Sequence, residues 1–166
     1  MTVLICDANI FIDLLKMDLI DEFFMLNNEM VVSSFVIEEV LDTNIDKILT
    51  RISTHKLRIF DFNPNQLSEI QILNQNYKGL SVADCSCLSL SKGPEAILLT
   101  NEKKLKIIAE NINIKVHGIL WILNKLIIEK IVRPRRAIEK LLYLKKINPR
   151  LPDDECQKFI NRWHKK

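Results

Sequence analysis

The chain has 166 residues, of which 48% are hydrophobic and 27% charged, and a net charge of +3, which is typical of one globular domain and not of a disordered chain. No apolar run reaches the roughly 18 residues of a membrane-spanning helix, and the N-terminus lacks the basic segment and long apolar core of a signal peptide. We therefore expect a cytoplasmic protein that does not enter a membrane.

The beginning of the chain predicts a strand followed by helices. Residues 3–6 form a short apolar run that is typical of a buried strand and ends at Asp7. Asn9 is expected to cap the next helix, because Asn side chains accept hydrogen bonds from free backbone amides. A second helical stretch is expected over residues 19–26.

Two more strands are predicted before the middle of the chain. Residues 30–33 form an apolar run that ends in serines, and Ser34 is the candidate cap of the helix that follows. Glu38 and Glu39 fall in the first turns of that helix, near its partial positive charge. Residues 57–60 are the third strand candidate.

The next segment predicts two helices and a fourth strand. After a first helix, Ser81 has the position of a helix cap, with Asp84 at the third helical position, where a capping box more usually has Glu or Gln. Residues 96–99 form the fourth strand, and Glu102 follows it closely.

A short fifth strand and three helices complete the pattern. The strand candidate is residues 114–116, and an apolar helix is expected over residues 119–128. Proline at position 134 is expected to begin a helix that reaches residue 146, and residues 153–164 are expected to form the last helix.

Charge is distributed unevenly along the chain. From Lys125 onward there are thirteen basic and five acidic residues, a net charge of +8, so residues 1–124 carry the remaining −5. This distribution suits an enzyme that binds metal with carboxylates and a phosphate backbone with cations. A solvated helix face explains it equally.

Strands that alternate with helices predict a three-layer α/β/α fold with a mainly parallel central sheet of about five strands. We expect residues 1–132 to form this domain and residues 133–166 to form a helical extension packed on it. Ligands of such sheets bind beyond the carboxyl ends of the strands. The acids expected near that edge are Asp7, Glu39, Asp84 and Glu102.

Carboxylates that share a pocket repel one another, and a divalent cation removes this penalty. Oxygen donors without a His or Cys pattern favour Mg²⁺ or Mn²⁺ over zinc. Such an ion lowers the pKa of a bound water, orients it for attack on phosphorus and stabilises the leaving oxygen. The alternative for each acid taken singly is a helix cap or a surface charge.

Four segments, in order and spacing, resemble the signature segments of PIN-domain nucleases. They are Ile5-Cys6-Asp7-Ala8-Asn9, Val36-Ile37-Glu38-Glu39-Val40, Leu80-Ser81-Val82-Ala83-Asp84 and Leu98-Leu99-Thr100-Asn101-Glu102-Lys103-Lys104-Leu105. Residues 117–123 are similar to a segment after the fifth strand in one prokaryotic branch of that family. The resemblance spans about residues 1–128.

The resemblance implies a Mg²⁺- or Mn²⁺-dependent ribonuclease, often the toxin of a VapC-type toxin–antitoxin pair. The invariant acids of the family would be Asp7, Glu39 and Asp84. Asn9 matches a polar position near the metal, and Thr100 matches the Thr before the fourth acid. That fourth acid is Glu102 where the family usually has Asp, and the extra methylene would shift or weaken a second metal. Glu38 is expected to face solvent.

Other chemistries lack support in the sequence. The cysteines, which form no Cys-x-x-Cys pair and are expected to be buried thiols, are Cys6, Cys85, Cys87 and Cys156. The histidines and serines fit no catalytic triad, and three glycines form no phosphate-binding loop. Trp121 and Trp163 are expected to pack on apolar helix faces.

The sequence therefore predicts a metal-dependent endoribonuclease that cuts single-stranded or loop RNA with an activated water. Candidate phosphate contacts are Lys103, Lys104, Arg133, Arg135 and Arg136. The resemblance implies an antitoxin protein and a homodimer as partners. A rival from another class is a non-catalytic PIN-like module that only binds RNA or protein, for which Glu102 is the main support. A DNA-directed nuclease would share the metal chemistry, but its usual additional acids and arch segments are not visible.

Overall fold

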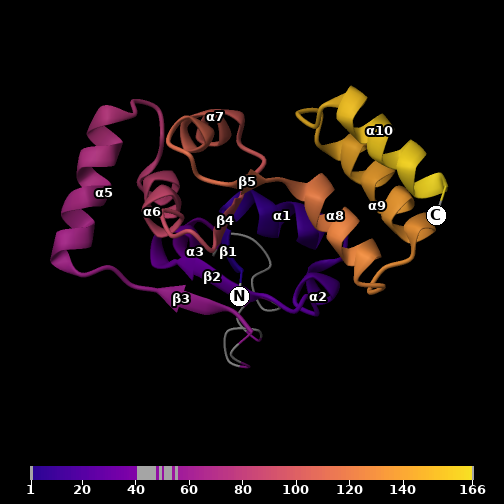
Figure 1. The fold of residues 1–166 in the computed structure, drawn as a ribbon, viewed down its shortest axis with the longest axis horizontal. Helices are drawn as coiled ribbons and strands as arrows, with labels where there is room; N and C mark the ends of the chain where they lie inside the picture. Colours follow the sequence, from indigo (N-terminus) through magenta and orange to yellow (C-terminus); the bar gives the residue numbers. More distant parts are fainter. Residues whose placement is uncertain (1, 41–47, 49, 51–53, 55, 166) are drawn as a thin grey trace.

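A computed structural model describes residues 2–40, 48, 50, 54 and 56–165. Within these residues, five strands form one sheet in the order β3-β2-β1-β4-β5. The strands are β1 (Val3–Cys6), β2 (Glu29–Ser33), β3 (Arg58–Phe60), β4 (Ala96–Leu99) and β5 (Val116–His117). Every neighbouring pair in this sheet is parallel, so the predicted mainly parallel sheet of about five strands is confirmed (Figure 1).

Helices connect the strands and cover the sheet. The helices of the first half are α1 (Ala8–Lys16), α2 (Ile20–Phe23) and α3 (Ser34–Val40), and those between β3 and β5 are α5 (Pro64–Asn76), α6 (Val82–Leu90) and α7 (Lys103–Asn111). The chain moves from β1 through β2 to β3 at one edge, and later from β4 to β5 at the other. Because parallel crossovers are right-handed, the two helix groups lie on opposite faces of the sheet. The three-layer α/β/α prediction is confirmed.

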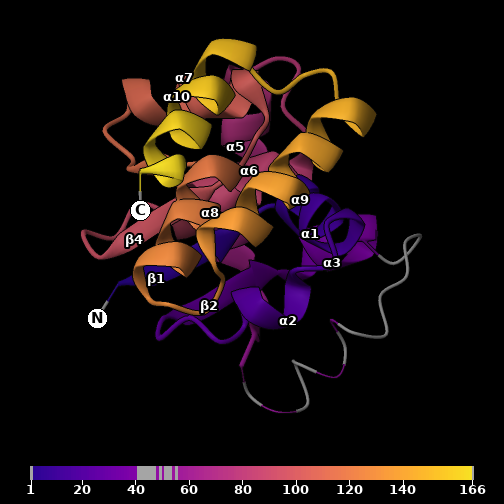
Figure 2. The same ribbon diagram turned by 90° about the vertical axis from the view of Figure 1, so that its right-hand side faces the viewer.

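Three C-terminal helices form a layer beside the sheet. They are α8 (Ile119–Ile128), α9 (Pro134–Ile147) and α10 (Asp153–His164). Helices α9 and α10 pack on each other and on α8, which also contacts α2 and β5 (Figures 1 and 2). In the described part of the chain, no helix is long and apolar enough to cross a membrane.

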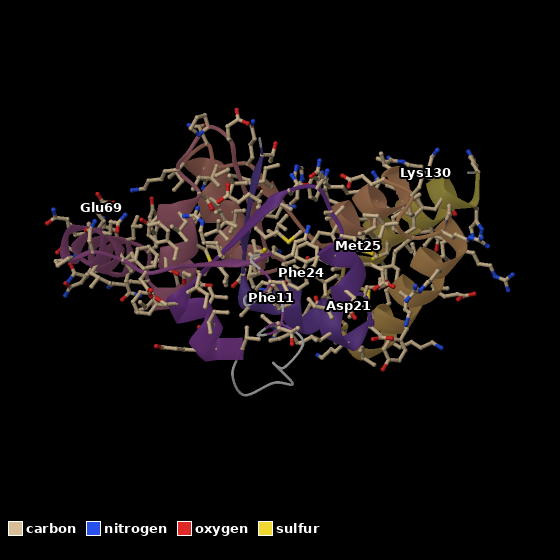
Figure 3. The ribbon with its side chains drawn as sticks, turned by 90° about the horizontal axis from the view of Figure 1, so that it is seen from below. Phe11, Asp21, Phe24, Met25, Glu69 and Lys130 are labelled. Atoms are coloured by element: carbon tan, nitrogen blue, oxygen red, sulfur yellow. The ribbon has the colours of Figure 1, made fainter. Side chains whose placement is uncertain are left out.

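The core follows the apolar patterns of the sequence. In α1, Ile10, Phe11 and Leu14 recur at helical spacing and all are fully buried. The Phe11 ring stacks on that of Phe24, with 6.5 Å between centroids, and both lie in the middle of the molecule (Figure 3). All four cysteines are free and buried, as predicted.

Two helix caps differ from the prediction. Asp7, and not Asn9, caps α1, because its side chain accepts a hydrogen bond from the Ala8 amide. The Ser33 hydroxyl, and not that of Ser34, accepts from the Val36 amide at the start of α3. In both cases the helix begins earlier than expected, and the cap is the last residue of the strand, Ser33, or the residue directly after it, Asp7. The predicted helix after Ser34 can be compared with the structure only up to residue 40.

Two element boundaries also differ. The helix expected over residues 19–26 is limited to Ile20–Phe23. The fifth strand lies at Val116–His117 and not at residues 114–116, because Asn113 takes a left-handed conformation with φ 62° and the Ile114 amide closes the end of α7 on Ala109. The last helices match their predicted ranges to within one residue.

Candidate active site

Asp7 stands at the carboxyl end of β1 with only 3% of its surface exposed. Its Oδ1 atom accepts a hydrogen bond of 2.7 Å from the Ala8 amide. The neighbours of β1 in the sheet are β2 and β4, which are reached in opposite directions along the chain. Asp7 therefore borders the switch point between β1 and β4, where open parallel sheets bind their ligands.

Two polar side chains hold the second oxygen of Asp7. The Asn9 amide nitrogen and the Thr100 hydroxyl each donate to Asp7 Oδ2 at 2.7 Å. Thr100 follows β4, and its Oγ1 in turn accepts from the Glu102 amide at 3.0 Å. These bonds fix the Asp7 carboxylate in one orientation and join the ends of β1 and β4. The structure thus places Asn9 and Thr100 directly on Asp7.

Asp84 is held by the start of α6. The Ser81 amide donates to Asp84 Oδ2 at 2.8 Å, and the Asp84 amide donates to Ser81 Oγ at 3.0 Å, so the two residues form a capping box. The helix with Asp84 packs against α3, which carries Glu39. The Glu39 and Ser81 side chains interact, and Glu38 is exposed.

Three of the acids lie close enough together to affect one another's ionisation. Burial raises the pKa of Asp7 to about 6 from an ordinary 3.8, and the charges of Asp84 and Glu39 add to the rise, while the Thr100 hydrogen bond opposes it. Burial and the charge of Asp84 likewise raise the pKa of Glu39. The same three carboxylates raise the pKa of the buried Cys87 thiol, after burial itself.

Glu102 has a different structural role from the other three acids. It caps α7, and its side chain accepts from the Lys104 amide at 3.4 Å. Its neighbour Lys104 turns its ammonium toward the carbonyl oxygen of Lys78, whereas Lys103 is exposed and lines a groove beside the site.

The predicted arginines lie at the start of α9, with Arg133 as its N-cap residue. Arg133 and Arg135 are exposed, and Arg135 pairs with Glu139 of the same helix at 3.3 Å. Arg136 forms an ion pair of 2.7 Å with Glu22. None of the three arginines lines the groove beside the carboxylates, so the structure does not bring them together with the acids.

A buried polar cluster next to the site was missed in the sequence. Asp13 is 3% exposed, and its Oδ2 accepts from the Asn101 side chain at 2.8 Å. The Asn148 amide, between α9 and α10, also reaches Asp13 at 3.4 Å. The Asn101 side-chain oxygen also accepts from the Ile119 amide, and the Asn101 backbone amide donates to Asn9 Oδ1. The sequence did contain a signal for this cluster: Asp13 is a carboxylate at a position of α1 that falls among its buried apolar residues.

The donor set at Asp7 suits a hard divalent cation. The three acids offer oxygen ligands only, and a cation would offset both the burial of the Asp7 charge, which is the main cause of its raised pKa, and the repulsion from Asp84 and Glu39. Among residues 2–40, 48, 50, 54 and 56–165, no three His, Cys, Asp or Glu side chains already stand in a metal-holding arrangement.

A parallel α/β sheet with carboxylates at its switch point belongs to the α/β domains that bind a ligand at the carboxyl edge of the sheet, and oxygen donors there suit a divalent cation. Comparison with known families makes this specific: a family model described as PIN domain matches residues 3–165, and the chain belongs to this family. PIN domains are generally nucleases, and the chain is a nuclease-like module.

The fold is also similar to a solved structure. The crystal structure of PAE2754 from Pyrobaculum aerophilum superimposes with a TM-score of 0.57 at 14% sequence identity, over 75% of this chain and 95% of that one. At this identity the likeness concerns the fold alone. A comparison with curated proteins found no match.

Proposed function

We propose that this protein is a metal-dependent endoribonuclease that hydrolyses RNA phosphodiester bonds with an activated water. The observation that carries the proposal is the buried Asp7 carboxylate at the switch point, with Asp84 and Glu39 close enough to raise its pKa. Proteins rarely gather three anions unless a cation or proton compensates them. Membership of the PIN-domain family supports the same conclusion.

Each residue has a distinct role in this proposal. The ligands of Mg²⁺ or Mn²⁺ would be Asp7, Asp84 and Glu39, and the bound ion would supply the Lewis acidity that activates water. Asn9 and Thr100 donate to Asp7, which stabilises the ionised carboxylate and keeps it oriented. The Glu39 side chain belongs to an exposed residue and is free to turn toward an ion.

We further propose a VapC-type toxin role, with an antitoxin protein that inhibits the enzyme and a homodimer as its working form. The support is the resemblance of the four acid-bearing segments to PIN-domain nucleases, which are often such toxins, and that of residues 117–123 to one prokaryotic branch of the family. A cytoplasmic location fits the four buried free cysteines, since free thiols persist in reducing compartments. A small reading frame directly upstream, with a product that inhibits cleavage, would support the toxin role.

One observation favours a second candidate function, a non-catalytic RNA- or protein-binding module. Glu102 already uses one carboxylate oxygen to cap α7, so fewer of its lone pairs and a more restricted orientation are available to a metal. A site with three acids would then hold a ligand without cleaving it.

The test is cleavage of a total-RNA pool by the purified protein in the presence of Mg²⁺ or Mn²⁺. We expect metal-dependent cleavage that EDTA abolishes. Asp7→Asn is expected to lower the rate more than about 100-fold, since even the outer partners of metal ligands are typically worth 10- to 100-fold.

The matched control is Asp154→Asn, which removes an exposed acid in the first turn of α10 and is expected to leave the rate unchanged. Equal activity of wild type and Asp7→Asn would contradict the catalytic assignment. RNA binding without cleavage under all metal conditions would instead favour the binding module.

A further inference from the structure

A groove with a volume of about 1030 Å³ extends from the carboxylate site. Asn9, Thr100 and Glu102 line it at the site. One wall is α7, and the opposite wall is the connection between α9 and α10, which lie on either side of β5 in Figure 1. A smaller pocket of about 350 Å³, beside Gly93 and Ile114, has no site carboxylate in its lining.

An aromatic pair lines the groove between these walls. The rings of His117 and Trp121 are parallel within 2°, with 4.6 Å between centroids. Both residues are only partly buried and line the groove. The Lys125 ammonium lies over the Trp121 ring, 5.6 Å from its centroid, so a base that extends this stack meets the His117 ring, which Trp121 supports. Burial, together with the charge of Lys106, lowers the pKa of His117, which favours a neutral ring at neutral pH.

The aromatic pair is fixed next to the active-site loop. The Thr100 amide donates to the His117 carbonyl oxygen at 2.9 Å. Gly118 allows the Asn101 side chain to lie close to the backbone after His117, because a Cβ atom there would lie 2.6 Å from Asn101 Oδ1. The same Thr100 holds Asp7, so the distance between the aromatic pair and the carboxylate site is set by the fold.

Cations stand on several sides of the groove. Lys103 and Lys106 are exposed on α7, Lys16 on α1 and Arg150 in the α9–α10 connection. Within the described residues, these four side chains form no ion pair. The carboxylates that line the same groove are Glu102, Glu110, Glu155 and the buried, hydrogen-bonded Asp13.

The mixed charge of the groove and its aromatic pair favour one kind of ligand. A duplex presents mainly its phosphates and keeps its bases stacked inside, so it would gain little from the rings. A single strand offers an unpaired base for stacking beside phosphates spaced for separate cations. The groove chemistry therefore fits a single strand better than a uniform polyanion.

We propose that this groove binds single-stranded RNA, with one unpaired base stacked on the His117–Trp121 pair and the neighbouring phosphates at Lys106 and Arg150. The proposal rests on the nuclease function proposed above and adds to it how the substrate is held. Trp121 and Lys106 become substrate-binding residues, whereas the arginines of α9 do not.

The experiment measures binding of a short fluorescent single-stranded RNA by anisotropy in EDTA, so that binding is separated from cleavage. Trp121→Leu is expected to weaken binding about 5- to 100-fold, the range for one base–aromatic stack. Trp121→Phe keeps a ring and is expected to retain most of the affinity. Lys106→Gln is expected to weaken binding several-fold and to reduce the salt dependence by about one ion.

Controls outside the groove separate this effect from general damage. Tyr143→Leu removes an aromatic ring that is 50% exposed on α9, and Arg135→Gln removes an exposed α9 cation; both are expected to bind as the wild type does. Circular dichroism of each variant verifies its fold.

Equal binding by wild type, Trp121→Leu and Lys106→Gln would overturn the proposal, as would equal affinity for a duplex of the same sequence. Groove variants that lose binding of an antitoxin protein but keep RNA affinity would also overturn it, because the groove would then be a protein site. Groove-dependent RNA binding without any cleavage would refute the nuclease function and leave this inference standing.

Discussion

At the scale of single residues, Asp7 is the side chain on which the site depends. It is almost completely buried, yet it faces two other carboxylates and accepts three hydrogen bonds. Burial and like charge favour the protonated form, and the donated hydrogen bonds favour the ionised form. The balance leaves its pKa at about 6, so this carboxylate changes its charge close to neutral pH.

We predict that metal-free protein loses stability as the pH rises from about 4 to about 6. The folded protein holds the Asp7 proton more tightly than the unfolded chain, whose Asp titrates near 3.8, so folding binds protons in this range and raising the pH disfavours it. The loss is at most roughly 3 kcal/mol. Urea unfolding at several pH values measures it.

Asp7→Asn provides the comparison, since its difference from wild type isolates this one group from the other acids. Mn²⁺ affinity should show the opposite trend and weaken about tenfold for each pH unit below 6, because the ion displaces one proton. A wild-type profile parallel to that of Asp7→Asn would contradict the prediction.

At the scale of elements, helix starts place the acids. Asp7 caps α1, Glu102 caps α7, and Asp84 closes the capping box of α6 with Ser81. Each carboxylate therefore lies beside the partial positive charge of a helix N-terminus, which is a favourable position for an acidic side chain. Parallel strands bring these helix starts to one edge of the sheet.

Ser81→Ala is expected to lower the free energy of unfolding by about 1 kcal/mol, because the Asp84 amide loses its partner. Thermal or urea denaturation measures the change. Ser68→Ala, at an exposed position inside α5, is the control and should stay within about 0.5 kcal/mol. An unchanged Ser81→Ala protein would mean that the cap contributes no stability.

At the scale of the whole molecule, the three C-terminal helices complete one wall of the groove and pack on the rest. Trp163 of α10 is 1% exposed, and its indole nitrogen donates to Asn124 of α8 at 3.1 Å. Asn148, between α9 and α10, contacts Asp13 of α1. These contacts tie the residues beyond 132 to the sheet domain.

Trp163→Ala is expected to cost about 3–5 kcal/mol, as for other buried aromatic residues. Unfolding should remain a single transition by circular dichroism and by the fluorescence of Trp121, because one cooperative unit contains both. Leu142→Ala, at a residue that is 45% exposed on α9, is the mild control. Two separate transitions would show that residues 133–166 form an independent unit.

The alternation of apolar runs and amphipathic helices was sufficient to predict the parallel sheet, because burial on both faces requires continuous apolar strands. Errors arose at boundaries. Asp7 directly follows β1, Ser33 ends β2, and each also caps the next helix, so strand and helix meet without a loop that propensity could reveal. The left-handed conformation of Asn113 belongs to the turn that ends α7, so the fifth strand begins later in the chain than predicted.

The sequence by itself determined the fold class, the order of the elements and the acids that follow the strands, because these depend on local periodicity and short-range hydrogen bonding. Only the tertiary structure decided that Asp7, Asp84 and Glu39 interact while Glu102 caps a helix. It also placed Trp121 beside the active-site loop and left the α9 arginines outside the groove. These results depend on contacts between residues far apart in the chain, which long-range packing sets and local pattern does not encode.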